Sequence, residues 1–187
     1  MERRLLIGIS GASGAPIAVE LLRQLRKASV FEIHLIVTRG AEMTLQQEAG
    51  LSLSDVRSLS DVFYEIDAIG ARPASGSFRM EGMIIVPCSM KTVAGIVSGY
   101  SDNLLLRAAD VMLKERRKLV LAARESPLST VHLRNLYEIS KLGGIIIPPM
   151  LTYYNHPKTV EDCTAAAAQR ILQQFLPGET FYEWEGM

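Results

Sequence analysis

The sequence predicts a three-layer α/β fold, in which a mainly parallel sheet carries helices on both faces. Short apolar runs of the kind expected for strands buried on both faces recur along the chain. Segments with the apolar spacing of amphipathic helices separate these runs. Alternation of strand and helix on this scale predicts parallel pairing with right-handed crossovers.

The strand and helix candidates follow each other in a regular order, and VFYEI at 62–66 is a weaker candidate that fits an edge strand. No internal repeat or low-complexity linker interrupts them. The predicted strands span 5–10, 32–37, 82–87, 118–123 and 143–148. The predicted helices span 15–28, 41–49, 91–99, 102–117, 129–142 and 159–175.

Length and charge limit the classes of protein to consider. The chain has 187 residues, 48% of them hydrophobic, which suffices for one substantial core and is short for two ordinary domains. We therefore expect a single domain over 1–187. Lys and Arg together number 20, as do Asp and Glu, which leaves no overall basic charge to attract nucleic acid or an anionic membrane. Any cationic function must be local.

The cysteines and histidines give no sign of a metal site. Cys88 and Cys163 lie far apart without a metal-binding spacing, as expected of a reduced cytoplasmic protein. His34, His132 and His156 also lack such a spacing, so we predict no bound metal. The apolar run before the first glycines is too short for a signal peptide or a membrane span, and we expect a soluble protein.

Glycines, hydroxyl groups and charged side chains directly follow the predicted strands. In a parallel sheet these segments gather at one edge, at the carboxyl ends of the strands, where doubly wound folds bind their ligands. The sequence therefore predicts one ligand site at this edge. The segments are GASG, TRG, CSMKT, RES and PMLTYY, in chain order.

Two of these segments have the composition of a phosphate-binding turn. Residues 11–14 (GASG) lead from a strand into a helix, so backbone N–H groups and the Ser13 hydroxyl can face an anion. Ser89, Lys91 and Thr92 offer hydroxyl and ammonium donors at the start of another helix. A tight turn without a ligand and simple helix capping explain the same residues. The spacing is not that of a P-loop nucleotide site.

The charges of the helix at 102–117 have two interpretations. Arg107, Asp110 and Lys114 share one helix face. A solvated surface accounts for residues 116–118 (RRK), whereas Arg107 and Lys114 fit either a solvated surface or a ligand.

Arg124 and Glu125 come directly out of an apolar strand at the predicted site edge. An unpaired charge would be costly there if it were buried. A ligand phosphate or a carboxylate partner would remove that cost, so both residues are candidates for the site.

One pattern favours a different class of enzyme. Tyr137 and Lys141 form a Y-x-x-x-K pair, and Arg39 after the second strand, together with GASG, resembles the NADP-binding arrangement of short-chain reductases. The chain is short for that family, and the pair precedes the last strand, which leaves little chain for a substrate-binding region. An NADP-dependent reductase is the alternative enzyme class.

Several long motifs carry a more specific resemblance. GISGASGA, SGSF with GMIIVPCSMKT, DNLLLRAADVMLKERRKLVL, RESPLSTVHLRN and IIIPPMLTYYNHP cover nearly the whole chain in this order. They resemble the UbiX-like flavin prenyltransferases, which include small partner proteins of aromatic and phenolic acid decarboxylases. The resemblance implies a Rossmann-like flavoprotein that binds FMN and assembles into a homo-oligomer, commonly a dodecamer.

The same resemblance implies a reaction. Dimethylallyl phosphate alkylates reduced FMN at N5 and closes a fourth ring at C6, which yields prenylated FMN, the cofactor of UbiD-type decarboxylases. A non-catalytic FMN carrier or decarboxylase subunit is the alternative. Whether the recipient serves ubiquinone biosynthesis or phenolic acid breakdown is left open.

Individual residues match the family's functional positions. Catalytic roles are implied for Ser13, Glu48, Lys114, Glu125 and Tyr154. Contacts with the prenyl donor are implied for Arg107, Lys114, Tyr154, Arg170 and Trp184. FMN contacts are implied for Gly11, Ala12, Ser13, Thr38, Ser89, Met90, Lys91, Thr92 and Arg124, with the FMN phosphate expected at Gly11, Ala12 and Ser13.

The expected chemistry explains why local cations are needed. The donor loses its phosphate without a metal ion, so fixed cations and a tyrosine hydroxyl must stabilise the developing charge. Lys114, Tyr154 and Arg170 would hold that phosphate, with Arg107 nearby. Glu125 would exchange a proton with it as a general acid.

Three other residues have expected supporting roles. Glu48 and Ser13 would orient groups or relay protons beside the flavin. Trp184 would close over the prenyl group or make an ordinary interface contact. Whether Glu48 and Arg170 act in their own subunit or in a neighbour is left open.

The chain departs from the family pattern at three places. Thr38 stands where many members have serine, which keeps the hydroxyl group. LTYY at 151–154 replaces a more usual PxFY, so the approach to the tyrosine can differ. PASGSF at 73–78 lacks the asparagine of the PASANT signature, which argues against a cysteine-residue decarboxylase.

Overall fold

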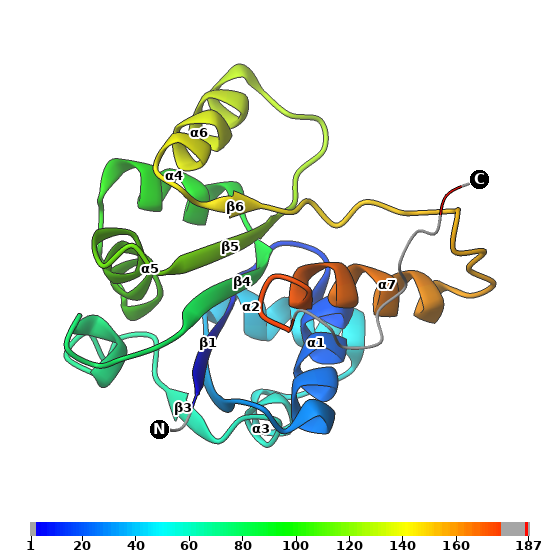
Figure 1. The fold of residues 1–187 in the computed structure, drawn as a ribbon, viewed down its shortest axis with the longest axis horizontal. Coiled ribbons are helices and arrows are strands. Elements are labelled where there is room, and N and C mark those ends of the chain that lie inside the picture. Colours follow the sequence, from blue (N-terminus) through cyan, green and yellow to red (C-terminus); the bar gives the residue numbers. More distant parts are fainter. Residues whose placement is uncertain (1–2, 177–185, 187) are drawn as a thin grey trace.

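The computed structural model describes residues 3–176 and 186, and it confirms the three-layer α/β fold (Figure 1). All six strands pair in parallel, in the order β3-β2-β1-β4-β5-β6. The strands are β1 (Arg4–Ile9), β2 (Glu32–Val37), β3 (Val62–Tyr64), β4 (Gly82–Cys88), β5 (Lys118–Ala123) and β6 (Ile145–Ile146).

The strand predictions hold within a residue or two, except at the last strand. The weak candidate at 62–66 forms the short edge strand β3, as predicted. The run at 143–148 contributes only two strand residues. Gly143 has a positive φ of 92° before the strand, and two prolines follow at 148 and 149, where no backbone N–H remains to extend the ladder.

The helices follow the prediction with three differences: the short helix α3 was not predicted, the helix expected at 102–117 ends at Lys114, and the helix expected at 41–49 differs in form. The expected helix at 41–49 begins earlier and changes into a π-helical turn, η1 (Leu45–Ala49), which places Glu48 beside the first loop. A short 3₁₀ turn, η2 (Arg72–Ala74), precedes β4. The helices are α1 (Ala15–Ala28), α2 (Arg39–Thr44), α3 (Leu53–Arg57), α4 (Met90–Ser98), α5 (Leu104–Lys114), α6 (Thr130–Lys141) and α7 (Val160–Leu172).

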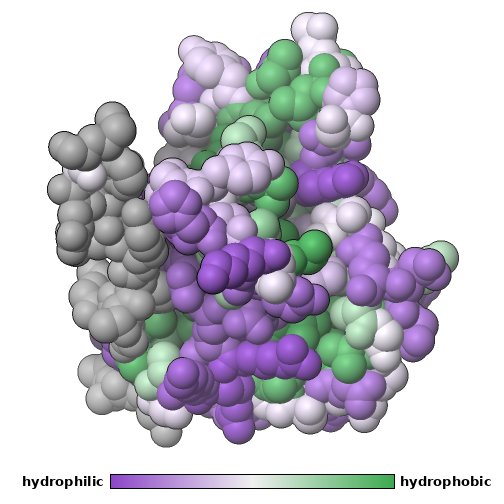
Figure 2. Space-filling view, turned by 90° about the vertical axis from the view of Figure 1, so that its right-hand side faces the viewer, coloured by the Kyte–Doolittle hydropathy of each residue, from purple (hydrophilic) through white to green (hydrophobic). Residues whose placement is uncertain are grey.

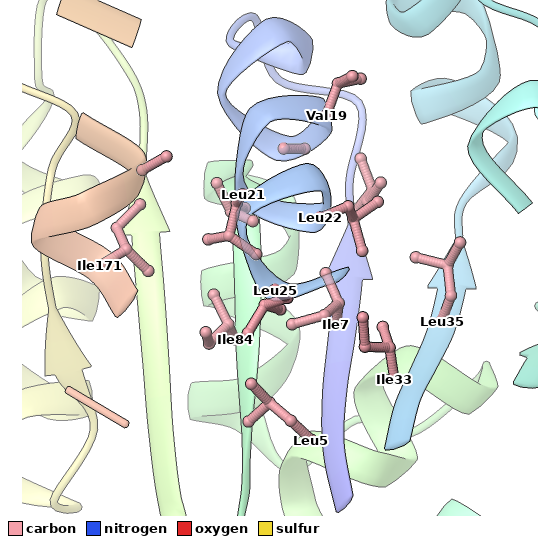
Figure 3. Packing of buried hydrophobic residues seen from close by; sticks show 14 of the residues in the cluster. Leu5, Ile7, Val19, Leu21, Leu22, Leu25, Ile33, Leu35, Ile84 and Ile171 are labelled. Atoms are coloured by element: carbon pink, nitrogen blue, oxygen red, sulfur yellow. The ribbon is translucent and has the colours of Figure 1, made fainter. Parts of the chain in front are cut away.

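Each face of the sheet is buried by its own set of helices. Helices α1 and α7 cover one face, and Figure 3 shows Leu22 and Leu25 of α1 and Ile171 of α7 directed at Ile7 and Ile84 of the sheet. Helices α4, α5 and α6 cover the other face. Burial on both sides explains why the central strands read as continuous apolar runs. Among the described residues, no helix is long and apolar enough to cross a bilayer.

The strand order sets the position of the site. The chain proceeds from β1 outward to β3 and then returns to β4 on the other side of β1. Such a reversal leaves a crevice at the carboxyl ends of the two strands where ligands of α/β proteins bind. The loop GASG follows β1 and the segment SMKT follows β4, so the two predicted phosphate-binding segments meet at this reversal.

Candidate functional site

A buried hydroxyl group joins the two loops of the crevice. Ser10 is 1% exposed, and its Oγ donates to the carbonyl of Pro87 at 2.8 Å while it accepts from the amide of Ser89 at 2.8 Å. Ser10 was missed in the sequence, although a polar residue that ends a buried strand was a usable signal. Its two hydrogen bonds fix the loop after β1 against the loop after β4.

The loops after β1 and β2 approach each other too closely for side chains. A Cβ atom at Gly11 would lie 2.9 Å from the backbone carbonyl carbon of Gly40. Real Cβ atoms essentially never come so near, and backbone cannot yield as a flexible side chain can. Glycine at position 11 is therefore required by this contact as well as by access of a ligand to the backbone.

A cavity of about 570 Å³ opens beside these loops. Its walls come from the segments after β1, β2 and β4, from the start of α5, and from the segment between β3 and η2. Its volume suits a cofactor-sized ligand. The lining residues are Ser10, Gly11, Thr38, Arg39, Gly40, Ile66, Asp67, Ser89, Lys91, Thr92, Asp102, Asn103, Leu105 and Leu106.

One end of this cavity gathers groups that donate hydrogen bonds. Ser89 caps α4, and its Oγ lies 3.1 Å from the hydroxyl of Thr92. The amides of Met90 and Lys91 in the first turn of α4 have no carbonyl partner within the helix. These amides, the hydroxyls and the Lys91 ammonium can together hold a phosphate.

The start of α1, in contrast, already holds an anion of the protein itself. The Glu48 carboxylate accepts from the amides of Gly14 at 2.8 Å and Ala15 at 3.0 Å. Burial opposes ionisation of Glu48, but these bonds, the hydroxyl of Ser13 and the charge of Arg124 outweigh it, so the pKa of Glu48 is lowered. A ligand phosphate therefore fits the α4 end of the crevice better than the start of α1.

Ser13 and Arg124 lie on the Glu48 side of the first loop. Ser13 is exposed, and the Arg124 backbone is held beside β4 by a hydrogen bond from its amide to Cys88 at 3.0 Å. Arg124 is an exposed side chain whose charge acts on Glu48. The predicted flavin contacts thus form two sets. One set, at the start of α4, is suited to bind a phosphate, and the other is Ser13 with Arg124 beside Glu48.

Of the five residues expected around the donor phosphate, Tyr154, Arg170 and Glu125 lie beyond the carboxyl ends of the strands. Tyr154 and Arg170 line a second cavity of about 430 Å³ between the segment after β6 and the second half of α7. Tyr154 is 51% exposed, and Glu125 is also exposed, with its Oε1 accepting from the Ser126 amide at 3.0 Å. These groups are open to solvent in a single chain.

The other two lie elsewhere on the molecule. Helix α5 runs back along the sheet for about 16 Å, so its last residue, Lys114, lies near the amino end of β5. The Lys114 ammonium contacts Glu115 Oε1 at 2.5 Å and lowers the pKa of that carboxyl. Arg107 donates to Asp110 at 2.7 Å and to the Ala74 carbonyl at 3.2 Å. One chain does not bring Lys114 together with Tyr154, and Trp184 lies outside the described residues.

Comparison with known proteins identifies the family. Residues 1–173 match the family described as Flavoprotein. Flavin prenyltransferase UbiX from Escherichia coli strain K12 is 46% identical over 187 residues, which cover 98% of this chain and 99% of that protein. This chain belongs to the UbiX-like flavin prenyltransferases.

Two solved structures share the fold of this flavin prenyltransferase over its length. A dodecameric FMN-dependent UbiX-like decarboxylase from Escherichia coli O157:H7 superposes with a TM-score of 0.94 at 47% identity, covering 98% of this chain and all of that one. AnUbiX (PadA1), in complex with FMN and dimethylallyl pyrophosphate, gives a TM-score of 0.96 at 44% identity over the full length of both chains.

The structure corrects one sequence interpretation within the flavin prenyltransferase. Arg117 is not part of a solvated surface, because its guanidinium donates to the carbonyls of Gly76 at 2.6 Å and Phe78 at 2.9 Å. It holds the PASGSF segment against the end of α5. Spacing along a helix could not reveal this contact, since the partner is a loop about forty residues away.

Of the features of the alternative reductase, Arg39 and Gly11 line the first cavity, whereas the Tyr137–Lys141 pair lies outside both cavities. Tyr137 is 63% exposed on α6, and the Lys141 ammonium lies 5.3 Å from the centre of its ring. Neither residue lines the cavity beside Gly11.

His34 is buried with its Nδ1 2.9 Å from the Tyr64 hydroxyl. The described part of the chain contains no cluster of side chains suited to a metal ion.

Proposed function

We propose that this flavin prenyltransferase joins the dimethylallyl group of dimethylallyl phosphate to N5 and C6 of reduced FMN, which makes prenylated FMN. The observation that carries this function is a donor-rich cavity at the strand reversal of a chain that matches flavin prenyltransferase UbiX along its full length. The chain acts as a single domain over 1–187.

The residues present suit an FMN molecule in one orientation. The phosphate fits against Ser89, Thr92 and the amides at the start of α4, with Thr38 and Lys91 beside it. Because Glu48 occupies the start of α1, the flavin ring, and not the phosphate, is placed beside Ser13 and Arg124. Gly11 and Ala12 are then the backbone over which the ribityl chain passes.

Glu48 has a positioning role in this proposal. Its lowered pKa keeps it ionised at neutral pH, so it holds the Ser13 hydroxyl and the Arg124 guanidinium in place rather than supplying a proton. Glu125 is then the better general acid, because its side chain is exposed at the carboxyl edge, where its Oε1 accepts from the neighbouring Ser126 amide.

The prenyl-donor residues require more than one copy of the chain. Tyr154 and Arg170 lie beside one cavity, with Glu125 also at the carboxyl edge, whereas Lys114 and Arg107 are carried by α5, whose end lies at the opposite edge of the sheet. If Lys114 contacts the donor phosphate, as the family match implies, it does so in a neighbouring subunit. A tyrosine hydroxyl and cations from two subunits then stabilise the departing phosphate without a metal ion.

Exposed apolar residues support this assembly. Met150, Leu151, Tyr153 and Val160 follow the last strand and are each more than half exposed. Figure 2 shows this side of the molecule, where hydrophobic surface lies exposed among hydrophilic residues. Apolar patches of this kind mark association surfaces, and the similar UbiX-like protein from Escherichia coli O157:H7 is a dodecamer. We propose a homo-oligomer of the same kind.

The product has a proposed destination. A UbiD-type decarboxylase is the recipient of prenylated FMN, in the cytoplasm. The free thiols of Cys88 and Cys163 fit such a reducing compartment.

Anaerobic incubation with reduced FMN and dimethylallyl phosphate, with EDTA present, tests this function. We expect a product with the mass of prenylated FMN. Dimethylallyl pyrophosphate is the matched second donor, because it is bound in the AnUbiX structure. Flavin that binds and stays unmodified with both donors would favour the non-catalytic carrier.

A further inference from the structure

An ion pair at the rim of the flavin cavity has no role in the function proposed above. The Arg39 guanidinium donates to Asp67 Oδ2 at 2.6 Å, and both residues line the cavity. Arg39 is the first residue of α2, whereas Asp67 belongs to the segment between β3 and η2. The pair therefore connects two separate walls of the cavity.

The wall that carries Asp67 is fixed through its backbone, whereas the ion pair itself is exposed. The Asp67 wall is tied to α5, because the carbonyl of Ile66 accepts from the amide of Leu104 at 2.9 Å. The pair itself is open to solvent, with Arg39 81% and Asp67 70% exposed. Ion pairs this exposed add little to stability, so the Arg39 side chain can exchange the carboxylate for a phosphate at little cost.

The cavity also contains carboxylates in an unexpected place for a phosphate site. Asp67 and Asp102 both line it, together with the donors of Ser89 and Lys91. A single terminal phosphate that contacts Arg39 and Lys91 takes the place of Asp67 on the Arg39 guanidinium. A ligand that continues beyond this phosphate would bring further negative charge toward the two acids, and like charges at short range repel.

We propose that the Arg39–Asp67 pair determines flavin specificity: it admits a flavin that ends in one phosphate monoester and disfavours a flavin extended by a second phosphate and a nucleoside, as in FAD. Arg39 binds the terminal phosphate through the paired N–H groups of its guanidinium. Asp67 pairs with Arg39 before the ligand binds and, once displaced, repels a second phosphate. The inference rests on the proposed binding of FMN.

Binding of FMN, riboflavin and FAD to purified variants tests this role. Arg39→Met keeps most of the side-chain length and removes the guanidinium, and we expect FMN to bind about tenfold more weakly while riboflavin changes by less than about twofold. Asp67→Asn keeps the volume and removes the charge, and we expect FAD to bind about fivefold more tightly relative to FMN. Glu138→Gln, in the exposed Glu138–Lys141 pair on α6, is the matched control.

The outcomes separate this inference from the proposed function. Two results would overturn the inference: wild-type protein that binds FMN no better than FAD, or an Asp67→Asn variant with an unchanged preference for FMN over FAD. Neither result would contradict the proposed binding of FMN. Equal weakening of FMN and riboflavin by Arg39→Met also overturns the inference, because the side chain would then act through folding. Wild-type protein that does not bind FMN overturns both.

Discussion

The two halves of the proposed site differ in how much of each one chain supplies. The cavity proposed for the flavin lies within a single chain, because Ser10 and Gly11 fix the loops after β1, β2 and β4 against one another beside it. The prenyl-donor half is dispersed, with Lys114 near the amino end of β5 and Tyr154 exposed beyond the carboxyl ends. From this difference we expect a single folded chain to bind the flavin, whereas alkyl transfer should depend on assembly.

Removing Lys114 should separate binding from catalysis most strongly. Lys114→Ala takes a cation from the departing phosphate, so we expect turnover to fall about 100-fold or more, as for loss of one oxyanion-stabilising group. FMN affinity should stay within about twofold of wild type, because Lys114 does not line the flavin cavity. Single-turnover assays and FMN titration measure the two quantities. Lys141→Ala is the matched control. If Lys114→Ala lost FMN binding along with turnover, Lys114 would belong to the flavin half as well, which would contradict the division into two halves.

A side chain at Gly11 should damage the flavin half directly. Gly11→Ala places a Cβ atom 2.9 Å from the Gly40 carbonyl carbon, so we expect about 1–3 kcal/mol of destabilisation and about tenfold weaker FMN binding. Denaturant unfolding and FMN titration check both effects. Gly70→Ala is the control, because its Cβ atom would meet nothing within 4 Å. If Gly11→Ala and Gly70→Ala behaved alike in both assays, the close approach of Gly11 to Gly40 would not be what requires glycine at position 11.

Loss of the Glu48 charge should have a smaller effect that depends on pH. Glu48→Gln weakens the cap on α1, and we expect a cost of about 0.5–1 kcal/mol in the free energy of unfolding near neutral pH. The pKa of Glu48 is lowered from 4.5 in the folded protein. Its stabilisation is therefore present above that ordinary value and is lost as pH falls through the folded pKa.

Unfolding of wild type and Glu48→Gln across this pH range measures the change. The stability difference should shrink on acidification, and Glu65→Gln, which alters net charge equally at an exposed position outside the α1 contact, is the matched control. A difference that grows on acidification would mean that Glu48 is held protonated in the fold and would restore it as a proton donor.

The smallest effect should come from the residues of the alternative reductase. Tyr137→Phe removes an exposed hydroxyl on α6, far from either half of the site. We expect FMN binding and prenyl transfer to change by less than about twofold, as is usual for a surface substitution. The same two assays measure this, and a large loss of turnover would give the Y-x-x-x-K pair a catalytic role after all.

The fold was predictable from the sequence because strands that are buried on both faces of a sheet have continuous apolar sequences. The runs at 32–37 and 118–123 match β2 and β5 residue for residue, and a cavity lies at the carboxyl edge where the predicted segments converge. The run at 143–148 was less informative, since glycine and proline limit strand pairing without changing hydropathy.

The details of the site depended on contacts that spacing does not encode. Nothing in the sequence placed Glu48 on the start of α1, because the contact depends on the π-helical turn at Leu45–Ala49. Likewise, the direction of α5 relative to the sheet separates Lys114 from Tyr154, although the family match groups them. Local pattern predicts elements, whereas the pairing of distant side chains follows only from their packing.

A hybrid-oligomer experiment tests the central claim that the prenyl-donor site needs two subunits. Lys114→Ala and Arg170→Ala chains, each inactive alone, are co-expressed with different tags and the mixed oligomer is purified through both. If the two residues serve one site from different chains, random mixing restores an intact pair in about a quarter of the sites, and activity should recover to about that fraction. Mixed oligomers as inactive as their parents would contradict the account.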